Sequence, residues 1–466
     1  MPNAYHVITE RLGFGGTYES GSMPANTSFL QDLLSTIADR GRQFIPQALL
    51  GVGRKDDIRY LAKALLTSKG EASGVAIARE ILTRFRALSA EEQRSFVRFV
   101  AETMQPDNEE VLKAATSFIA SPSKATLRAL QTAVESPRQE FFRRLNLAPG
   151  ATAEIVSLRA SFLSEARSDP VLASLDADLQ HLLYSWFNRG FLVLRRIDWQ
   201  TPAAVLEKII AYEAVHQIQG WDDLRRRLEP ADRRLFAFFH PSLVDEPLIF
   251  VEVALTDHIP GSIQAVLGEH RKPPGAQLAP TVAVFYSISN CQEGLRGISF
   301  GNFLIKQVVE ELAKEVPSLK TYVTLSPVPG FARWLSGALA APAGGKDALA
   351  DAEREALTAL QSSRWLEAED EGDSLREPLL TAAAHYFLRV KDSNGYPFDP
   401  VARFHLGNGA SLDRINWLGD ISEKGLRQSH GLMVNYRYDL GEIEANHEAY
   451  ENAKAVATSR AVRSLL

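Results

Sequence analysis

The sequence has a single cysteine, Cys291, in 466 residues. One cysteine excludes an intramolecular disulfide and a cysteine-cluster zinc site, and it is typical of a chain from a reducing compartment. Long uncharged apolar runs are missing as well, so we expect no membrane-spanning helix. Because the start MPNAYHVITERLGFGG lacks the apolar core of a signal peptide, we expect a cytoplasmic protein.

The sequence also lacks an excess of positive charge. It has 51 Lys and Arg against 57 Asp and Glu, a formal net charge of −6. This balance excludes a global basic field that would hold nucleic acid or an anionic membrane, although a local basic pocket for a small anion remains compatible. No His, Cys and carboxylate cluster has metal-ligand spacing, so we expect no metal. Hydrophobic residues make up 45 % and charged residues 23 %, which predicts a globular chain of at least two domains.

Hydrophobic periodicity predicts an all-helical domain over residues 1–190. Asp107 and Ser123 are N-cap residues of two successive helices. After the first cap, apolar residues recur on one face, namely Val111, Leu112, Ala115, Phe118 and Ile119. Such stripes are expected to pack on neighbouring helices of a bundle. We interpret this half as an oligomerisation or scaffold domain rather than a ligand-binding one, in a homo-oligomer that is either a dimer or a tetramer.

The pattern changes in residues 191–466. Short runs rich in Val, Ile, Phe and Thr, bounded by Pro, Gly and polar turns, predict strands. These runs are FLVLRRIDW, RLFAFFH, LIFVEVALT, TVAVFYSIS, TYVTLS and GLMVNYRYDL. Helical patterns interrupt them at Pro202–Glu213 and Phe303–Val316, and VARFHL and SLDRINWL flank an Asn-Gly pair that predicts a hairpin. The second domain is therefore expected to be α/β with a mixed sheet.

A glycine-rich turn joins the uncharged strand TVAVFYSIS to the amphipathic helix that follows it. Gly294, Gly297 and Gly301 lie in this turn. At a helix N-terminus the unpaired N–H groups and the positive end of the macrodipole attract anions, and glycine lets a ligand approach the backbone. The turn is therefore either a phosphate site or a tight turn that needs positive φ. A dinucleotide fold is disfavoured because the G-x-G-x-x-G pattern is absent.

Residues Arg296-Gly297-Ile298-Ser299-Phe300-Gly301 resemble the (Arg/Gln)-x-x-Gly-x-(Gly/Ala) signature of the acetyltransferase fold, although Ser299 stands where the signature usually has Gly. In that fold the turn holds the pyrophosphate of coenzyme A. A wider similarity covers roughly Trp221 to Leu440: HPSLVDEPLIFVEVALT, QEGLRG, TLSPVPGF, FHLGNGA, RINWL and GLMVNYRY resemble, in this order, the malonyl-CoA decarboxylase family.

This resemblance implies an acetyltransferase-like catalytic domain in residues 191–466. It also implies the conversion of malonyl-CoA to acetyl-CoA and carbon dioxide, without a metal or an organic cofactor. The coenzyme A handle is then expected on the loop made of Arg296, Gly297, Ile298, Ser299, Phe300, Gly301 and Asn302. Eukaryotic relatives often carry Glu at the position of Ser299, so a role for that Glu does not transfer to this chain.

The family's catalytic serine and histidine fall on Ser326 and His405. Without the resemblance, Ser326 is equally a serine that ends a strand before Pro327, and His405 is a structural histidine in a strand. With it, we assign Ser326 to the malonyl carboxylate. We assign His405 to donate a proton to the enolate carbon, because histidine titrates near neutral pH.

Two further side chains complete the expected site, and three other histidines are weighed against His405. Tyr438 is expected to steady the carboxylate or the histidine through its hydroxyl, and Ser287 to reach the thioester. His240 is the second choice for the acid, whereas His385 and His430 are expected to be structural.

Two other functions are compatible with an acyl-CoA site. One is an acyltransferase of the same fold, which needs an acceptor such as an amine. The other is a non-catalytic acyl-CoA sensor, which binds without turnover. The segments TLSPVPGF and FHLGNGA argue against the first, because fold similarity alone predicts nothing there.

Overall fold

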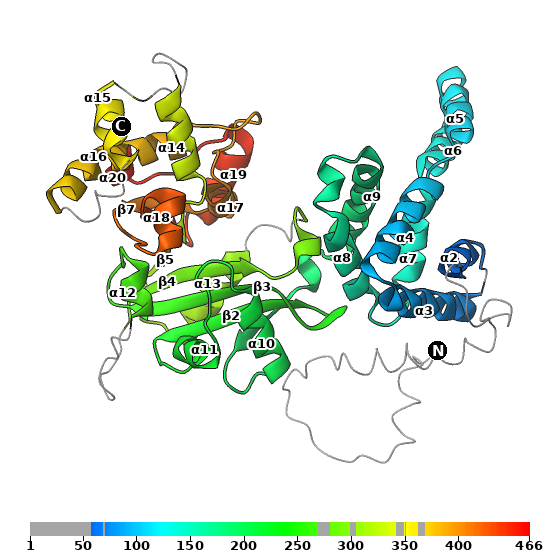
Figure 1. Cartoon of the computed structure of the whole chain (residues 1–466), viewed down its shortest axis with the longest axis horizontal. Coiled ribbons are helices and arrows are strands. Elements are labelled where there is room, and N and C mark those ends of the chain that lie inside the picture. The colour runs from blue at the N-terminus through cyan, green and yellow to red at the C-terminus, as the bar shows by residue number, and fades with distance from the viewer. Residues whose placement is uncertain are drawn as a thin grey trace, which may run out of the picture.

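The structure is a computed structural model, and it describes residues 57–68, 70–268, 280–298, 304–341, 349, 351–361 and 369–466. The predicted loop residues Ser299, Phe300, Gly301 and Asn302 lie outside the described residues. Along the chain, a helical part comes first and a part built on a β-sheet follows (Figure 1).

The first part is helical, as predicted. Its helices are α2 (Asp57–Thr67), α3 (Glu71–Ala87), α4 (Ala90–Thr103), α5 (Asn108–Ala120), α6 (Lys124–Val134), α7 (Pro137–Leu145), α8 (Ala151–Phe162) and α9 (Pro170–Trp186). Short 3-10 turns follow at η3 (Glu165–Arg167) and η4 (Arg189–Phe191). The N-caps lie where the sequence predicts them: Asp107 accepts from the first N–H groups of α5, and Ser123 forms a capping box with Thr126.

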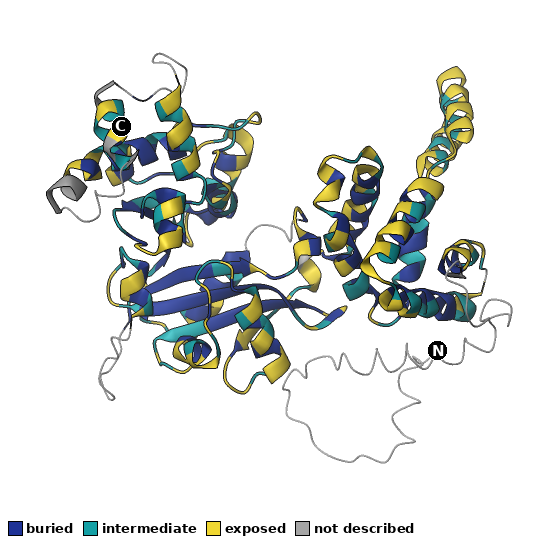
Figure 2. Cartoon of the chain, in the orientation of Figure 1, coloured by how far each residue is buried: buried dark blue, intermediate teal, exposed yellow. Residues whose placement is uncertain are grey.

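The α5–α6 hairpin departs from the predicted packing. It stands away from the other helices (Figure 1), and neither helix buries a residue. Leu112 and Ile119 of the predicted stripe are 69 % and 78 % exposed, as the colouring of Figure 2 shows for the whole hairpin. The prediction that this stripe is buried is therefore wrong for the single chain, because the two helices pack on each other and leave their outer apolar side chains in solvent.

The second part contains the predicted mixed sheet. The strands are β1 (Val193–Ile197), β2 (Arg233–His240), β3 (Leu243–Thr256), β4 (Val282–Asn290), β5 (Thr321–Thr324), β6 (Ser326–Pro327), β7 (Ser411–Asn416) and β8 (Met433–Tyr438). Their order is β1-β2-β3-β4-β5-β8-β6, with β7 also paired to β8. The pair β4–β5 is parallel and the other pairs are antiparallel.

Helices cover this sheet and extend beyond its end. They are α10 (Ala203–Tyr212), α11 (Trp221–Leu228), α12 (Ile263–Leu267), α13 (Leu304–Glu315), α14 (Phe331–Ala340), α15 (Asp351–Leu357), α16 (Glu369–Leu388), α17 (Pro400–Gly407), α18 (Glu423–Ser429), α19 (Ile443–Ala453) and α20 (Arg460–Arg463). The 3-10 turns are η5 (Glu293–Leu295) and η6 (Thr358–Gln361). Helices α10 and α13 correspond to the two helical patterns in the sequence.

The segment VARFHL forms helix α17 and not the predicted strand. Asp399 caps this helix by accepting from the N–H groups of Val401 and Ala402, and Pro400 occupies its first turn. The predicted Asn-Gly turn exists, but it joins a helix to β7. Gly409 has a φ of 83°, which favours glycine at this turn.

Strands β4 and β5 separate at their carboxyl ends. Their parallel register ends at Phe285 and Thr324. Beyond it, β4 continues beside β3 past a register shift, whereas the chain at Ser326 turns to pair with Val434 of β8. Ligands of α/β sheets bind beyond the carboxyl ends of strands at such openings.

One hydrophobic cluster extends through both parts of the molecule. It includes Leu179 of α9, Phe187 at the C-cap of that helix, Leu295 of η5, and Phe285 of β4. The buried sheet appears in dark blue in Figure 2. Among the residues that the structure describes, no helix combines the length and the apolar character needed to cross a membrane.

Candidate active site

Three side chains that the sequence analysis assigns to catalysis meet at the opening between β4 and β5. His405 Nε2 lies 3.1 Å from Ser326 Oγ, and His405 Nδ1 lies 2.8 Å from the Tyr438 hydroxyl. The three residues come from α17, β6 and β8, which are far apart in the sequence. All three are buried, with exposures of 4 % for Ser326, 3 % for His405 and 1 % for Tyr438.

The hydrogen bonds around Ser326 fix the direction of this chain of contacts. Ser326 Oγ donates to Thr324 Oγ1 at 2.8 Å. A hydroxyl has one hydrogen, so the hydrogen between Ser326 and His405 belongs to the imidazole Nε2. Nδ1 of the neutral ring then accepts from the Tyr438 hydroxyl. The site is therefore a directed chain from Tyr438 through His405 and Ser326 to Thr324.

Strand β8 holds both ends of this chain of hydrogen bonds, Tyr438 and Thr324, in place. Asn435 Nδ2 donates to the Thr324 carbonyl at 2.6 Å, and the Tyr436 N–H donates to Thr324 Oγ1 at 3.1 Å. The Tyr436 ring stacks on the His405 imidazole, with ring centroids 4.6 Å apart. The sequence analysis did not identify Thr324 or Tyr436. Strand alternation supplies a signal for Thr324, which lies two residues before Ser326.

Burial keeps the two titratable side chains in this hydrogen-bonded set, His405 and Tyr438, neutral. It lowers the pKa of His405 to about 3 and raises the pKa of Tyr438 well above its usual value. An anion placed beside the imidazole would oppose the first effect, because a nearby opposite charge favours the protonated ring.

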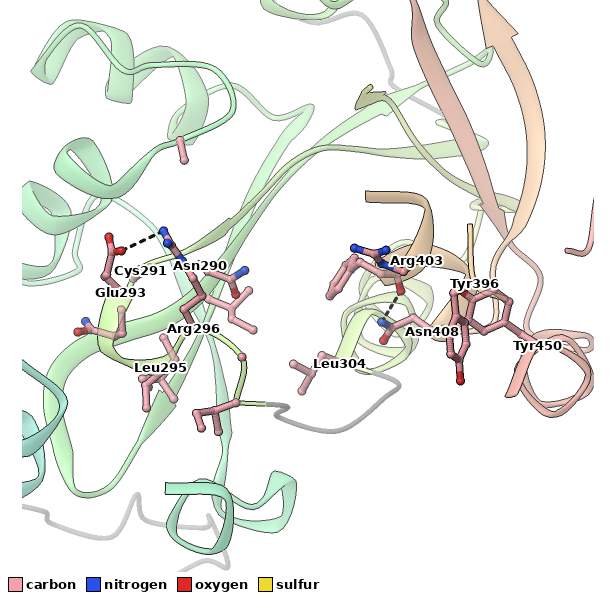
Figure 3. A pocket seen from close by; sticks show the side chains of 18 of the residues that line it. Asn290, Cys291, Glu293, Leu295, Arg296, Leu304, Tyr396, Arg403, Asn408 and Tyr450 are labelled. Carbon is pink, nitrogen blue, oxygen red and sulfur yellow. Dashed lines mark hydrogen bonds and ion pairs between the residues drawn. The ribbon is translucent and has the colours of Figure 1, made fainter. Parts of the chain in front are cut away.

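A cavity of about 700 Å³ lies against helix α17 (Figure 3), and Ser326, His405 and Tyr438 do not themselves line it. One wall is the turn after β4, with Arg296, Gly297 and Ile298, and the opposite wall includes Phe404 and Gly407 of α17. These two α17 residues flank His405, so the cavity leads to the helix that carries the imidazole. Figure 3 shows the two walls facing each other across Leu304.

Both walls of the cavity present arginine side chains. Arg296 forms an ion pair with Glu293 at 3.0 Å, and its side chain is 58 % exposed. Across the cavity, Arg403 forms an ion pair with Asp392 at 3.3 Å. These exposed pairs are weak and are readily exchanged for an anionic ligand.

The predicted site residue Ser287 is engaged elsewhere. Its hydroxyl lies 2.8 Å from both carboxylate oxygens of Glu213, and Ser289 donates to the same group at 3.1 Å. The N–H groups of Val215 and His216 also donate to Glu213. This buried carboxylate anchors the connection between α10 and α11 to β4. The contact of Ser287 with a thioester stays a prediction.

Two of the three glycines of the turn are described, and they serve different purposes. Gly297 has a φ of 81°, in the left-handed region that glycine adopts readily. At Gly294, a Cβ atom would lie 1.8 Å from the carbonyl oxygen of Val156 in α8. Gly294 is therefore required by close packing against the helical part and not by a ligand. Gly301 lies outside the described residues.

Comparison with known proteins identifies the family. Residues 190–466 match the family "Malonyl-CoA decarboxylase C-terminal domain", and residues 104–187 match "Malonyl-CoA decarboxylase N-terminal domain". This chain belongs to the malonyl-CoA decarboxylase family. It is 38 % identical over 354 residues to "Malonyl-CoA decarboxylase, mitochondrial" of Anser anser anser, covering 71 % of this chain and 70 % of that protein.

Two crystal structures of malonyl-CoA decarboxylases resemble this chain over most of its length. The enzyme from Rhodopseudomonas palustris is 53 % identical with a TM-score of 0.84, over 88 % of this chain and 100 % of that one. The enzyme from Agrobacterium vitis is 52 % identical with a TM-score of 0.82, over 88 % of this chain and 99 % of that one. The structural similarity covers both the helical part and the sheet.

The other histidines of interest lie outside the directed chain in this family member. The ring of His240 packs on Phe187 with centroids 4.8 Å apart, and His385 stacks on Trp334 at 6.0 Å. His430 ends helix α18 with a φ of 50°. Burial raises the pKa of the Cys291 thiol far above its usual value, which makes it a poor nucleophile.

Proposed function

We propose that this protein decarboxylates malonyl-CoA to acetyl-CoA and carbon dioxide. The malonyl group is placed at the hydrogen-bonded residues Tyr438, His405 and Ser326. The observation that carries the proposal is this buried, directed set of hydrogen bonds. A cavity of about 700 Å³ lies against α17, the helix that carries His405, in a member of the malonyl-CoA decarboxylase family.

The reaction asks little covalent chemistry of the protein. When the C–C bond to the carboxylate breaks, its electron pair moves into the thioester as an enolate, and the thioester oxygen carries the charge. The protein must hold the coenzyme, turn the carboxylate out of the thioester plane and deliver one proton to carbon.

Ser326 and His405 supply the last two of these functions. When the substrate binds, the Ser326 hydroxyl turns its hydrogen from Thr324 Oγ1 to the malonyl carboxylate and becomes the donor to that group. The anion raises the pKa of the neighbouring imidazole, which therefore takes up a proton as the substrate enters. After carbon dioxide leaves, the Nε2 hydrogen moves to the enolate carbon and a C–H bond forms. The Tyr438 hydroxyl orients the ring through Nδ1.

The coenzyme A handle is assigned to the turn after β4. Arg296, Gly297 and Ile298 line the cavity, and the proposed contacts of Ser299, Phe300, Gly301 and Asn302 continue this loop outside the described residues. Ser287, on the preceding strand, is proposed to reach the thioester. Binding energy at this remote handle orients the reacting end of the substrate.

The organisation of the molecule completes the proposal. We divide the chain into a helical scaffold of residues 1–190 and a catalytic part of residues 191–466. We place the protein in the cytoplasm as a homo-oligomer, dimer or tetramer, in which the exposed apolar side chains of the α5–α6 hairpin are covered by a second copy. The exposure of Leu112 and Ile119 supports this arrangement.

The first test is an assay without any acceptor. Purified protein is incubated with malonyl-CoA and a chelator, and acetyl-CoA and carbon dioxide are followed. Release of both is the expected result. Intact malonyl-CoA would overturn the proposal and favour an acyltransferase, which acceptor amines would reveal, or a sensor that binds without turnover.

A further inference from the structure

Arg159 of helix α8 extends from the helical part to the turn that we assign to coenzyme A. Its Nη1 donates to the carbonyl oxygens of Gly294 at 2.6 Å and of Arg296 at 3.0 Å. The side chain is 1 % exposed, so both bonds are shielded from water. A buried guanidinium therefore holds two carbonyl groups of a turn that lies more than a hundred residues later in the sequence.

The orientation of Arg159 is fixed from the other side. Its Nε pairs with Asp176 Oδ1 of α9 at 2.6 Å, and Gln180 Nε2 donates to the second oxygen of that carboxylate at 2.5 Å. Asp176 thus engages one edge of the guanidinium and leaves Nη1 for the turn. The planar fork of arginine suits this double engagement, because its donors point in fixed directions.

Backbone packing leaves the turn little freedom to move. A Cβ atom at Gly294 would lie 1.8 Å from the carbonyl oxygen of Val156, one turn of α8 before Arg159. Leu295 is buried in the hydrophobic cluster that also contains Ile155 and Leu158 of α8. Immediately beyond these contacts, Arg296, Gly297 and Ile298 line the cavity.

We propose that Arg159 is a positioning residue for coenzyme A binding: from the helical part, it fixes the turn that presents Arg296 and Gly297 to the cavity. This inference rests on the proposed function, since it takes the cavity as the coenzyme site. It assigns to the helical part a role in substrate affinity in addition to its role as a scaffold.

The test uses Arg159→Lys in the full-length protein. Lysine keeps the positive charge, but its single ammonium group does not reproduce the fork that joins Asp176 to two carbonyls. We expect the KM for malonyl-CoA and the Kd for coenzyme A to rise on the order of 10-fold, as for the loss of a hydrogen bond to a charged group. The kcat should stay near that of the wild type, because the directed chain at His405 is untouched.

Arg138→Lys is the matched control. Arg138 of α7 is 2 % exposed, donates to the Ala101 carbonyl at 3.0 Å and pairs with Asp178 at 2.8 Å, all within the helical part. Both variants should lower the melting temperature, but only Arg159→Lys should weaken coenzyme A binding. Unchanged affinity in Arg159→Lys, or equal weakening in both variants, would show that the residue is merely structural.

A second variant covers the case in which Arg159→Lys does not fold. Asp176→Asn keeps the volume of the side chain but removes the charge that orients the guanidinium, so a smaller rise in Kd is expected. Wild-type affinity in this variant would overturn the proposal. Because the Kd for coenzyme A is measured without turnover, these outcomes are separate from a failure of the decarboxylation assay.

Discussion

At the scale of the residue, His405 combines two properties that set its chemistry. It lies between two hydroxyl groups, and burial lowers its pKa to about 3. The imidazole is therefore neutral at neutral pH, and a role as proton donor requires a nearby negative charge that raises its pKa.

The His405→Asn variant should lose turnover and keep coenzyme A binding. Asparagine retains a hydrogen-bonding side chain but has no ring that accepts and releases a proton. We expect kcat to fall by about 100-fold or more, the usual contribution of a general acid. Initial rates with malonyl-CoA and calorimetric titration with coenzyme A measure the two quantities separately.

Two further variants serve as comparisons for His405→Asn. His240→Asn changes a buried histidine that packs on Phe187 outside the directed chain, and it should retain turnover. Ser326→Ala should lower turnover as well, since it removes the partner of the carboxylate. Equal loss of kcat and of coenzyme A affinity in His405→Asn would argue against its role as proton donor.

Asp399 makes the stability of the folded protein depend on pH. Its carboxylate is 1 % exposed, and burial raises its pKa to about 6, although it caps α17 and accepts from Tyr386 at 3.4 Å. Because the folded pKa lies above the unfolded value, this group stabilises the protein most below that unfolded value. Its contribution is lost as the pH rises through about 6.

The Asp399→Asn variant should remove this dependence. Its oxygen still caps the helix, since asparagine and aspartate are equally good N-caps. Between pH 5 and pH 8, the unfolding free energy of the variant minus that of the wild type should rise by on the order of 1–2 kcal/mol and level off above about pH 7. Urea unfolding at pH 5, 6 and 8 measures it, and a flat difference would show that the carboxyl titrates alike in both states.

At the scale of the element, local signals in the sequence predicted most of the structure. Helix caps such as Asp107 and Ser123, and uncharged runs such as TVAVFYSIS, form the elements that their chemistry favours. The segment VARFHL was predicted wrongly because its Val and Phe favour a strand. The cap at Asp399 and the proline after it outweigh this preference.

The site was predictable only in part, for a physical reason. Ser326 and His405 were assigned through the family resemblance and Tyr438 from its hydroxyl group, and the structure brings the three together. The support from Tyr436 and Arg159 depends on contacts between distant segments, which composition and periodicity do not encode. The burial that shifts the pKa of His405 is likewise a property of the packed molecule.

The α5–α6 hairpin should form an interface between copies of the chain. Leu112 and Ile119 on α5, with Leu127 and Val134 on α6, are all exposed. Two paired helices bury too little apolar surface alone, and a second hairpin would complete a four-helix arrangement around a twofold axis. Replacing Leu112 and Ile119 by Glu should therefore lower the molar mass measured by light scattering to that of the monomer.

The control for this interface is Ser117→Glu, at an exposed polar position of the same helix that does not share the face of Leu112 and Ile119. It adds a charge to α5 without removing apolar surface, so the molar mass should stay that of the wild type. An oligomer that persists after both Leu112 and Ile119 are charged would place the interface on another surface.

At the scale of the whole molecule, the helical part and the sheet share one hydrophobic core. The cluster that contains Phe285 of the sheet also contains Phe187, the C-cap of α9, whose ring packs on His240 of β2. Arg159 and the close approach of Val156 to Gly294 add polar and backbone contacts across the same boundary. Separating the two parts would expose this surface to water, so neither is expected to stay folded when the other unfolds.

The full chain should therefore unfold in a single calorimetric transition, with equal van't Hoff and calorimetric enthalpies. Coenzyme A at about 100 times its Kd should shift this whole transition upward, corresponding to about 2.7 kcal/mol of added stability. The reason is that the turn holding the ligand is packed on α8, so the helical part cannot melt while the coenzyme stays bound. Two transitions, of which only one responds to coenzyme A, would mean that the shared core does not couple the two parts.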